Sequence, residues 1–204
     1  CIIKSDGTVS IQNRAFFQFT SLKSVSIQVA TINFELQSFQ QVTGLNELRV
    51  TATDSIIVGQ NAFQSAGIEL IEFDAGNKIA IQSTFSIASL NLTSNGIIDI
   101  GQNAFQSSNI KAIYIEATES VSIGLQSFQS CSYITNLEIE SKNSGISFGM
   151  SSFMKSIISE VVLKAHDDII FGQQAMQEVT NLSKLIVITQ GNFNATFETF
   201  LQST

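Results

Sequence analysis

The chain has 204 residues, of which 44% are hydrophobic and 13% are charged, and this balance argues against an intrinsically disordered protein. Its net charge of −7 argues against a broad nucleic-acid-binding surface and against attraction to an anionic membrane. No apolar run in the sequence approaches the roughly 18–20 residues that a membrane-spanning helix needs, so we expect no membrane span.

The stretch GQNAFQS occurs at 59–65 and again at 101–107, and Gly-x-x-x-Phe also occurs at 124–128 and 149–153. Self-similarity of this kind indicates a repeat protein. Counting on the Phe, with Met at one place, gives spacings of 20 to 25 residues around a period of 23. We call these nine residues the anchors: Phe16, Phe39, Phe63, Phe85, Phe105, Phe128, Phe153, Met176 and Phe200.

Each repeat begins with a short strand, which is predicted from two alternating apolar residues before the anchor. The anchor segment that follows, such as NAFQSSNI at 103–110, has apolar residues three to six positions apart, which predicts one helical or 3₁₀ turn. The alternating pairs are Val9/Ile11, Ile32/Phe34, Ile56/Val58, Ile79/Ile81, Ile98/Ile100, Val121/Ile123, Ile146/Phe148, Ile169/Phe171 and Phe193/Ala195.

A second strand follows each anchor segment, with the pattern apolar-x-x-apolar-x-apolar. In the fourth repeat the distance from Phe85 to this strand, at Leu90 and Leu92, is about three residues shorter, so we expect a pinched coil there. The other matches are Leu22/Val25/Ile27, Leu45/Leu48/Val50, Ile68/Ile71/Phe73, Ile110/Ile113/Ile115, Ile134/Leu137/Ile139, Ile158/Val161/Leu163 and Leu182/Leu185/Val187.

No single coil can bury its anchor and its aliphatic side chains alone, whereas stacked coils share one continuous core. We therefore expect residues 1–204 to form one solenoid domain of about eight to nine repeats. Because the chain starts with Cys1 and not with Met, we also expect it to be part of a longer protein.

The order of these motifs resembles the BspA-type leucine-rich repeats, most clearly at VGQNAF (58–63) and IGQNAF (100–105). The resemblance implies an α/β solenoid: a right-handed coil stack with a parallel concave β-sheet, a short second strand and a short helical or 3₁₀ turn per repeat of about 23 residues. It also implies adhesion or recognition at a cell surface through the concave sheet. The alternative architecture is a parallel β-helix, which has coils of similar length.

If the second strands line a concave face, the residues between their buried positions project outward in columns. The middle of this face is then acidic and its C-terminal end is apolar, which predicts a docking surface for a basic partner with an apolar anchor. The alternative is a solvated face. The candidate binding residues are Arg49, Glu72, Asp74, Tyr114, Glu116, Glu138, Glu140, Val162, Ile186 and Ile188.

We find no pattern that predicts catalysis, a metal site or a cofactor, so we expect a protein that is not an enzyme. His166 lies beside Asp167 and Asp168, but a transition-metal site generally wants three or four ligands and the chain has no second His. We interpret this stretch as a solvated turn. No Gly-rich phosphate loop, GxSxG motif or CxxC pair is present.

Three Asn-x-Ser/Thr triplets, at Asn91, Asn181 and Asn194, are candidate glycosylation sites. Cys131 is expected to be a buried small residue behind Phe128. Cys1 is compatible with a fragment boundary, with half of a disulfide, or with the lipid-bearing first residue of a lipoprotein.

Two functions follow as hypotheses. The first is a non-enzymatic, extracellular or cell-surface protein that binds a protein or glycan ligand through its concave face. The second is a structural subunit that stacks end to end, as a homo-oligomer, into an extracellular filament or surface coat, because exposed end coils invite strand pairing.

Overall fold

The structure, a computed structural model, describes residues 1–82, 86–196 and 198–203. This part of the chain forms sixteen strands joined by turns and contains no helix. The strands are β1 (Ile2–Lys4), β2 (Thr8–Ile11), β3 (Ser24–Phe34), β4 (Leu45–Val58), β5 (Gly67–Ala75), β6 (Lys78–Ile81), β7 (Ser86–Ser94), β8 (Ile97–Ile100), β9 (Ala112–Ala117), β10 (Val121–Ile123), β11 (Ile134–Ser141), β12 (Ile146–Phe148), β13 (Ile158–Ala165), β14 (Ile169–Phe171), β15 (Lys184–Thr189) and β16 (Phe193–Ala195).

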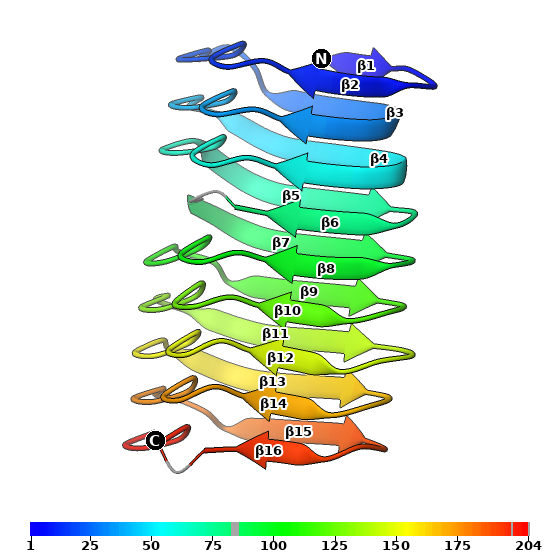
Figure 1. Cartoon of the computed structure of the whole chain (residues 1–204). Coiled ribbons are helices and arrows are strands. Elements are labelled where there is room, and N and C mark those ends of the chain that lie inside the picture. Colours follow the sequence, from blue (N-terminus) through cyan, green and yellow to red (C-terminus); the bar gives the residue numbers. More distant parts are fainter. Residues whose placement is uncertain (83–85, 197, 204) are drawn as a thin grey trace.

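The strands pair in two parallel stacks that run the length of the molecule (Figure 1). The long-strand sheet contains β1, the first parts of β3 and β4, and then β5, β7, β9, β11, β13 and β15. The short-strand sheet contains β2, the second parts of β3 and β4, and the even-numbered strands from β6 to β16. The near strands of Figure 1 run left and the far strands run right as the chain descends, so the coil is right-handed.

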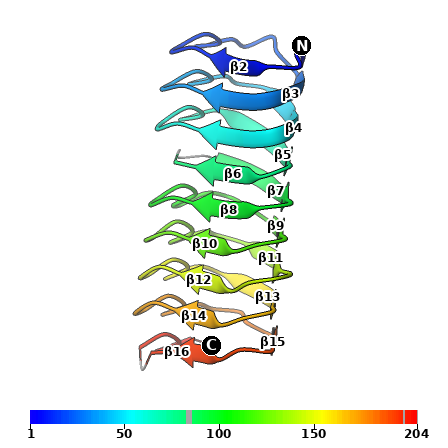
Figure 2. The same ribbon diagram turned by 45° about the vertical axis from the view of Figure 1, so that its right-hand side comes forward.

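The result is a parallel β-solenoid of about eight turns with repeats of about 23 residues, as the sequence period predicts. Every predicted alternating pair lies in a strand of the short-strand sheet. β3 and β4 continue through the corner between the sheets, so the two stacks join into one sixteen-stranded sheet. Figures 1 and 2 show a nearly straight column, so the long-strand sheet presents an almost flat face where we expected a concave one.

The anchors form a column of stacked rings in the core. Phe16 and Phe39 have ring centroids 4.6 Å apart, and Phe105, Phe128 and Phe153 follow one another at 4.9 and 5.0 Å with nearly parallel planes. Phe39 and Phe63 are also stacked, and Met176 is buried in the next coil. The two anchors in the end coils, Phe16 and Phe200, are only partly buried, and Phe85 lies outside the described residues.

The helical or 3₁₀ turn predicted for each anchor segment is wrong for the described anchor segments, which contain no helix. Asn103 and Ser107, two residues before and after the anchor Phe105, have φ angles of 57° and 58°. A right-handed helix needs negative φ throughout, so these left-handed residues prevent it. The N–H of Phe105 instead donates to the carbonyl of Ser127 in the next coil at 2.7 Å, which makes the turns a third hydrogen-bonded ladder between coils.

The Gly of the Gly-x-x-x-Phe motif is required by the close approach of neighbouring turns. A Cβ atom on Gly149 would lie 2.7 Å from the carbonyl carbon of Gly124, and one on Gly124 would lie 2.7 Å from that of Gly101. No side chain fits at these distances. The repeated heptapeptide therefore combines a ring that fills the core with a glycine that lets adjacent turns stack.

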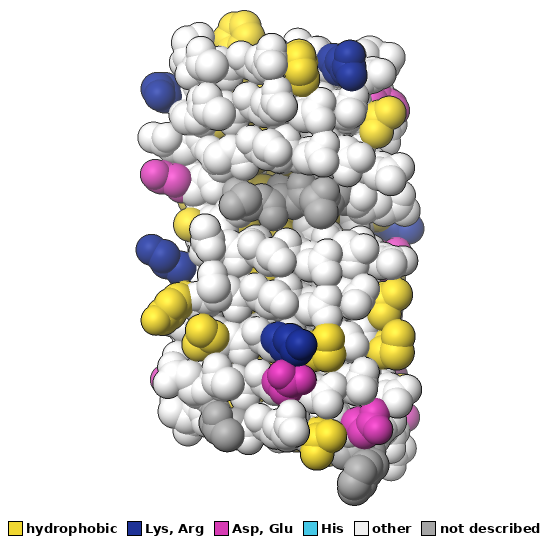
Figure 3. All heavy atoms as spheres, turned by 90° about the vertical axis from the view of Figure 1, so that its left-hand side faces the viewer, with side chains coloured by type: hydrophobic (Ala, Val, Ile, Leu, Met, Phe, Trp, Pro, Cys, Tyr) yellow, Lys and Arg dark blue, Asp and Glu magenta, His cyan; other side chains and the backbone are white. Residues whose placement is uncertain are grey.

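The turn segments form a face of mostly uncharged polar side chains, with scattered charges (Figure 3). Amide side chains on this face bond from coil to coil: Gln40 donates to Gln64 at 2.7 Å, and Gln106 donates to Gln129 at 2.7 Å. These side-chain hydrogen bonds add to the backbone hydrogen bonds that join neighbouring coils.

Candidate functional site

The outward side chains of the long-strand sheet stand in straight columns, because consecutive strands pair in register. Both columns expected from the sequence form, and we call the surface that they make the long-strand face. One column holds Ser26, Arg49, Glu72, Asn91, Tyr114, Glu138, Val162 and Ile186, and the other holds Gln28, Thr51, Asp74, Thr93, Glu116, Glu140, Lys164 and Ile188.

A third column on the same face was not predicted. Extending the period-two count two residues toward the start of each long strand would have found it. It holds Ser24, Glu47, Leu70, Ser89, Ala112, Asn136, Glu160 and Lys184.

The glutamates in the middle of the face are paired with cations, a feature that the sequence pattern did not predict, whereas Asp74 is exposed and has no ion pair within the described residues. The Lys164 ammonium lies 2.8 Å from a Glu138 oxygen and 3.5 Å from a Glu140 oxygen. Exposed pairs of this kind contribute about 0–1 kcal/mol each to stability. A cationic side chain of a binding partner can therefore displace Lys164 from these carboxylates with little loss of free energy. The other ion pairs of the face are Arg49–Glu47, Arg49–Glu72, Lys142–Glu116 and Lys184–Glu160.

Tyr114 and Glu116 share a hydrogen bond at the centre of the face, with the Tyr114 hydroxyl as donor. This bond raises the pKa of Tyr114 to about 12, because losing the proton would lose the bond. Glu116 also accepts a hydrogen bond from the Lys142 ammonium, and this bond, with that from Tyr114, lowers the pKa of Glu116. Both groups therefore keep one protonation state through the neutral range.

The C-terminal end of the face is apolar. Val162 pairs with Ile186 across β13 and β15, and both side chains are half-buried. Ile188, which pairs with Lys164, is 57% exposed. This end offers a small apolar patch beside the ion-paired carboxylates.

The three candidate glycosylation sites lie in different surroundings. Asn91 is half-buried in the middle of β7, and its Oδ1 atom is buried without a hydrogen-bond partner among the described residues. Asn181 is exposed and donates to Ser159 Oγ at 3.0 Å, and Asn194 is exposed in β16. Glycosylation remains a prediction at all three, with Asn91 the least accessible.

His166 and the two cysteines show no arrangement for chemistry. The His166 side chain is half exposed and contacts Asp167 at 2.9 Å. Within the described residues, no group of three or more His, Cys, Asp or Glu side chains is arranged to hold a metal ion. Burial raises the pKa of the Cys131 thiol to about 11, which leaves it protonated and unreactive, while Cys1 is exposed.

Stacked coils that share one core pattern and differ in their outward side chains define a solenoid repeat scaffold. The BspA type leucine rich repeat region model matches residues 9–122 and 98–200, with six copies, so the chain belongs to the BspA-type leucine-rich repeat family. Comparisons with curated proteins and with solved structures gave no match. Proteins of this family are generally non-enzymatic interaction scaffolds and are commonly surface-associated. Within the described residues, no helix is long and apolar enough to span a membrane.

Proposed function

We propose that this protein is a non-catalytic recognition protein of a cell surface, and that it binds a protein partner through the long-strand face. The observation that carries the proposal is the register of that face, which places charged and apolar side chains from consecutive coils in straight columns. Membership of a family of interaction scaffolds supports it.

The chemistry of the face favours a partner segment that is basic and carries an apolar side chain. Lysine or arginine side chains of the partner would take the place of Lys164 on Glu138 and Glu140. The apolar side chain would cover Ile188, which is exposed next to Lys164. Complementary charge sets orientation and association rate, and the buried apolar contact contributes affinity.

A library of displayed peptides, selected against the immobilised protein, tests this proposal. We expect selected peptides to combine Lys or Arg with an apolar residue. Their affinity should fall about tenfold or more for Glu138→Gln with Glu140→Gln, and for Ile188→Glu, because each change removes a central contact. Ser147→Arg, on the exposed surface of the short-strand sheet, is the matched control. Peptides that bind all of these variants equally would remove the long-strand face from the proposal.

The cell-surface location is tested separately. Antibodies against the protein should label intact, unpermeabilised cells of the source organism. Labelling that requires permeabilisation would contradict the surface assignment while leaving the binding face in place.

One observation favours a second candidate function, end-to-end assembly. Leu185 and Phe193 occupy inward-facing positions of β15 and β16, and they are 40% and 44% exposed. A coil from a second copy would bury them. Sedimentation velocity over a range of concentrations should show larger species if copies stack, and Leu185→Glu should abolish them. A single monomer boundary at high concentration would eliminate this function.

A further inference from the structure

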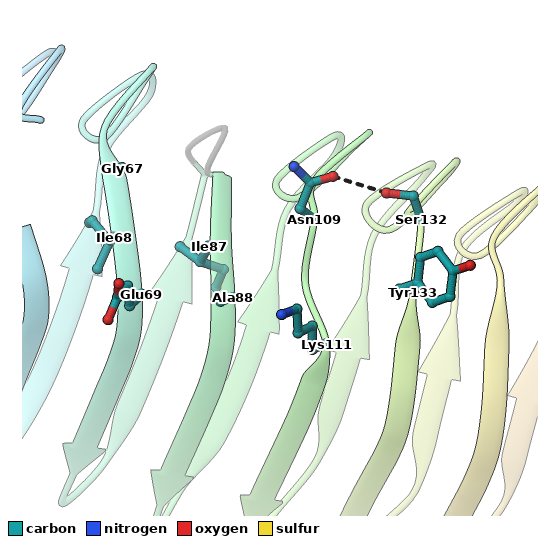
Figure 4. Close-up of a pocket in the computed structure, with 9 residues that line it drawn as sticks. All are labelled: Gly67, Ile68, Glu69, Ile87, Ala88, Asn109, Lys111, Ser132 and Tyr133. Atoms are coloured by element: carbon teal, nitrogen blue, oxygen red, sulfur yellow. Dashed lines mark hydrogen bonds between the residues drawn. The ribbon is translucent and has the colours of Figure 1, made fainter. Parts of the chain in front are cut away.

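A hollow of about 620 Å³ opens on the surface where four neighbouring coils leave the turn segments (Figure 4). It lies at the starts of β5 and β7 and just before β9 and β11, at the turn-side edge of the long-strand face. The shortened fourth coil lies in the middle of it. Leu90 lies only five positions after residue 85, whereas Ile71 and Ile113 lie eight positions after Phe63 and Phe105. The hollow therefore coincides with the one large deletion in the repeat.

The floor of the hollow is apolar and its walls are low. Ile68 and Ile87 are buried and supply the floor, while Ala88 adds only a methyl group. Gly67 has no side chain, and a Cβ atom built on it would meet no atom within 4 Å. The backbone at Gly67 does not have a positive φ, so this opening does not depend on strained geometry.

The rim carries one exposed aromatic ring and several polar groups of different kinds. Tyr133 is 65% exposed, and in Figure 4 its ring bounds one side while its hydroxyl points away from the hollow. Ser132 Oγ donates to Asn109 Oδ1 at 2.9 Å, which fixes the orientation of this amide. Lys111, just before β9, extends toward Ala88, and Glu69 lies in β5.

We propose that this hollow is a carbohydrate-binding subsite that holds a short segment of a glycan chain, two or three sugar rings laid across the four coils, with one pyranose ring on Tyr133. A pyranose has an apolar C–H face, which stacks on the Tyr133 ring, and hydroxyl groups that both donate and accept hydrogen bonds. The rim supplies both kinds of partner: Lys111 and the Asn109 amide donate, and Glu69 accepts. Few convergent polar groups over an apolar floor are the usual composition of a small-molecule site.

Other ligand chemistries fit the hollow less well. A phosphate or sulfate group would meet the carboxylate of Glu69 as well as the single Lys111 ammonium. An apolar peptide side chain would leave the polar rim groups without partners, which is costly when they are covered. A glycan segment is the ligand class that can contact the Tyr133 ring, the apolar floor at Ile68 and Ile87, and the hydrogen-bond donors and acceptors of the rim.

A printed array of neutral and amino-sugar oligosaccharides is the probe for this site. We expect the folded protein to bind a subset of them, and Tyr133→Ala to weaken that binding about tenfold, as loss of a stacked ring should. Tyr133→Phe should retain binding, because the hydroxyl points away from the hollow. Gly67→Gln should block the site, because its side chain enters open space. Thermal unfolding checks that each variant is folded.

The outcome is independent of the protein-binding proposal. Glu138→Gln with Glu140→Gln should leave glycan binding unchanged, and Tyr133→Ala should leave binding of the selected peptides unchanged. If no oligosaccharide binds, or if Tyr133→Ala and Gly67→Gln bind the array as the wild type does, the subsite proposal is overturned. Failure of the peptide experiment alone would overturn only the long-strand face.

Discussion

At the scale of single residues, an anchor ring inside the stack is held by the rings of the two neighbouring coils. Phe128 is fully buried and stacks on Phe105 and Phe153 with interplanar angles of 8° and 3°. The sequence was sufficient to identify the described anchors, because a large apolar residue that returns at a constant period marks a core position shared by all coils. It could not show that Phe16 and Phe200 are only partly buried, since that depends on having a neighbour on one side alone.

Phe128→Ala should destabilise the protein by about 3–5 kcal/mol, because it removes a ring from the middle of the stack and leaves a cavity. Chemical denaturation followed by circular dichroism measures the difference. Phe16→Ala is the matched control and should cost clearly less, since that ring stacks on only one other anchor, Phe39. Equal costs for the two variants would contradict a continuous core.

Tyr114 gives a pH-dependent prediction. Its pKa in the folded protein is raised from the ordinary value of 10.0 to about 12 by the hydrogen bond to Glu116. The bond therefore contributes its full stability below about pH 10 and loses it as the pH rises from about 10 to 12. Ultraviolet titration of a Tyr133→Phe variant isolates Tyr114, because the chain has two tyrosines. Glu116→Gln should lower the midpoint, and a wild-type midpoint near 10 would refute the bond.

At the scale of elements, the strands were predictable and the turns were not. Alternating apolar pairs located the short strands, and the same alternation gave the register of two columns on the long-strand face. The turns were misassigned because spacings of three to six suit a helix as well as successive turns, and the left-handed φ of Asn103 and Ser107 leaves no periodic signal. The ion pair of Glu116 was not predicted, because its partner Lys142 lies just after β11 and so falls outside the strand pattern.

Gly149→Ala tests the close packing of the turns. The added Cβ would lie 2.7 Å from the backbone of Gly124, so the turns must move apart, and we expect a loss of about 1–3 kcal/mol in unfolding free energy. Gly67→Ala is the control: its Cβ enters open space, so stability should be unchanged or slightly higher. If both substitutions behave alike in chemical denaturation, close approach is not the reason for the motif glycine.

At the scale of the whole molecule, stability depends on neighbour contacts between coils and not on any contact between distant ones. The core is one continuous cluster, yet each strand pairs only with the strands of adjacent coils. The repeat period and the motif order were sufficient to predict a right-handed stack of 23-residue coils and the family. The α/β class was wrong, because the described residues form strands and turns without a helix, as in the parallel β-helix that we kept as the alternative. The flat shape and the hollow at the fourth coil needed coordinates, because they depend on how residues of several coils meet.

Removal of one whole repeat should leave a folded protein. Deleting residues 106–128 joins Phe105 directly to Gln129 and preserves the stacking register, so we expect a shorter solenoid with cooperative unfolding at a somewhat lower temperature. Deleting residues 106–117, about half a coil, should abolish folding, because it would place short strands against long ones. Circular dichroism and thermal melting distinguish the cases. A misfolded product from the whole-repeat deletion would contradict the claim that each coil depends only on contacts with its two neighbours.

The direction of the strand hydrogen bonds has a mechanical consequence. They join one coil to the next along the length of the column, so a pull on its two ends loads them one row after another instead of all together. Under such tension the protein should peel coil by coil, each step releasing about 23 residues of slack, or roughly 80 Å of extended chain. A molecule built in this way would extend gradually when its two ends are pulled apart, and would absorb mechanical work over a long distance.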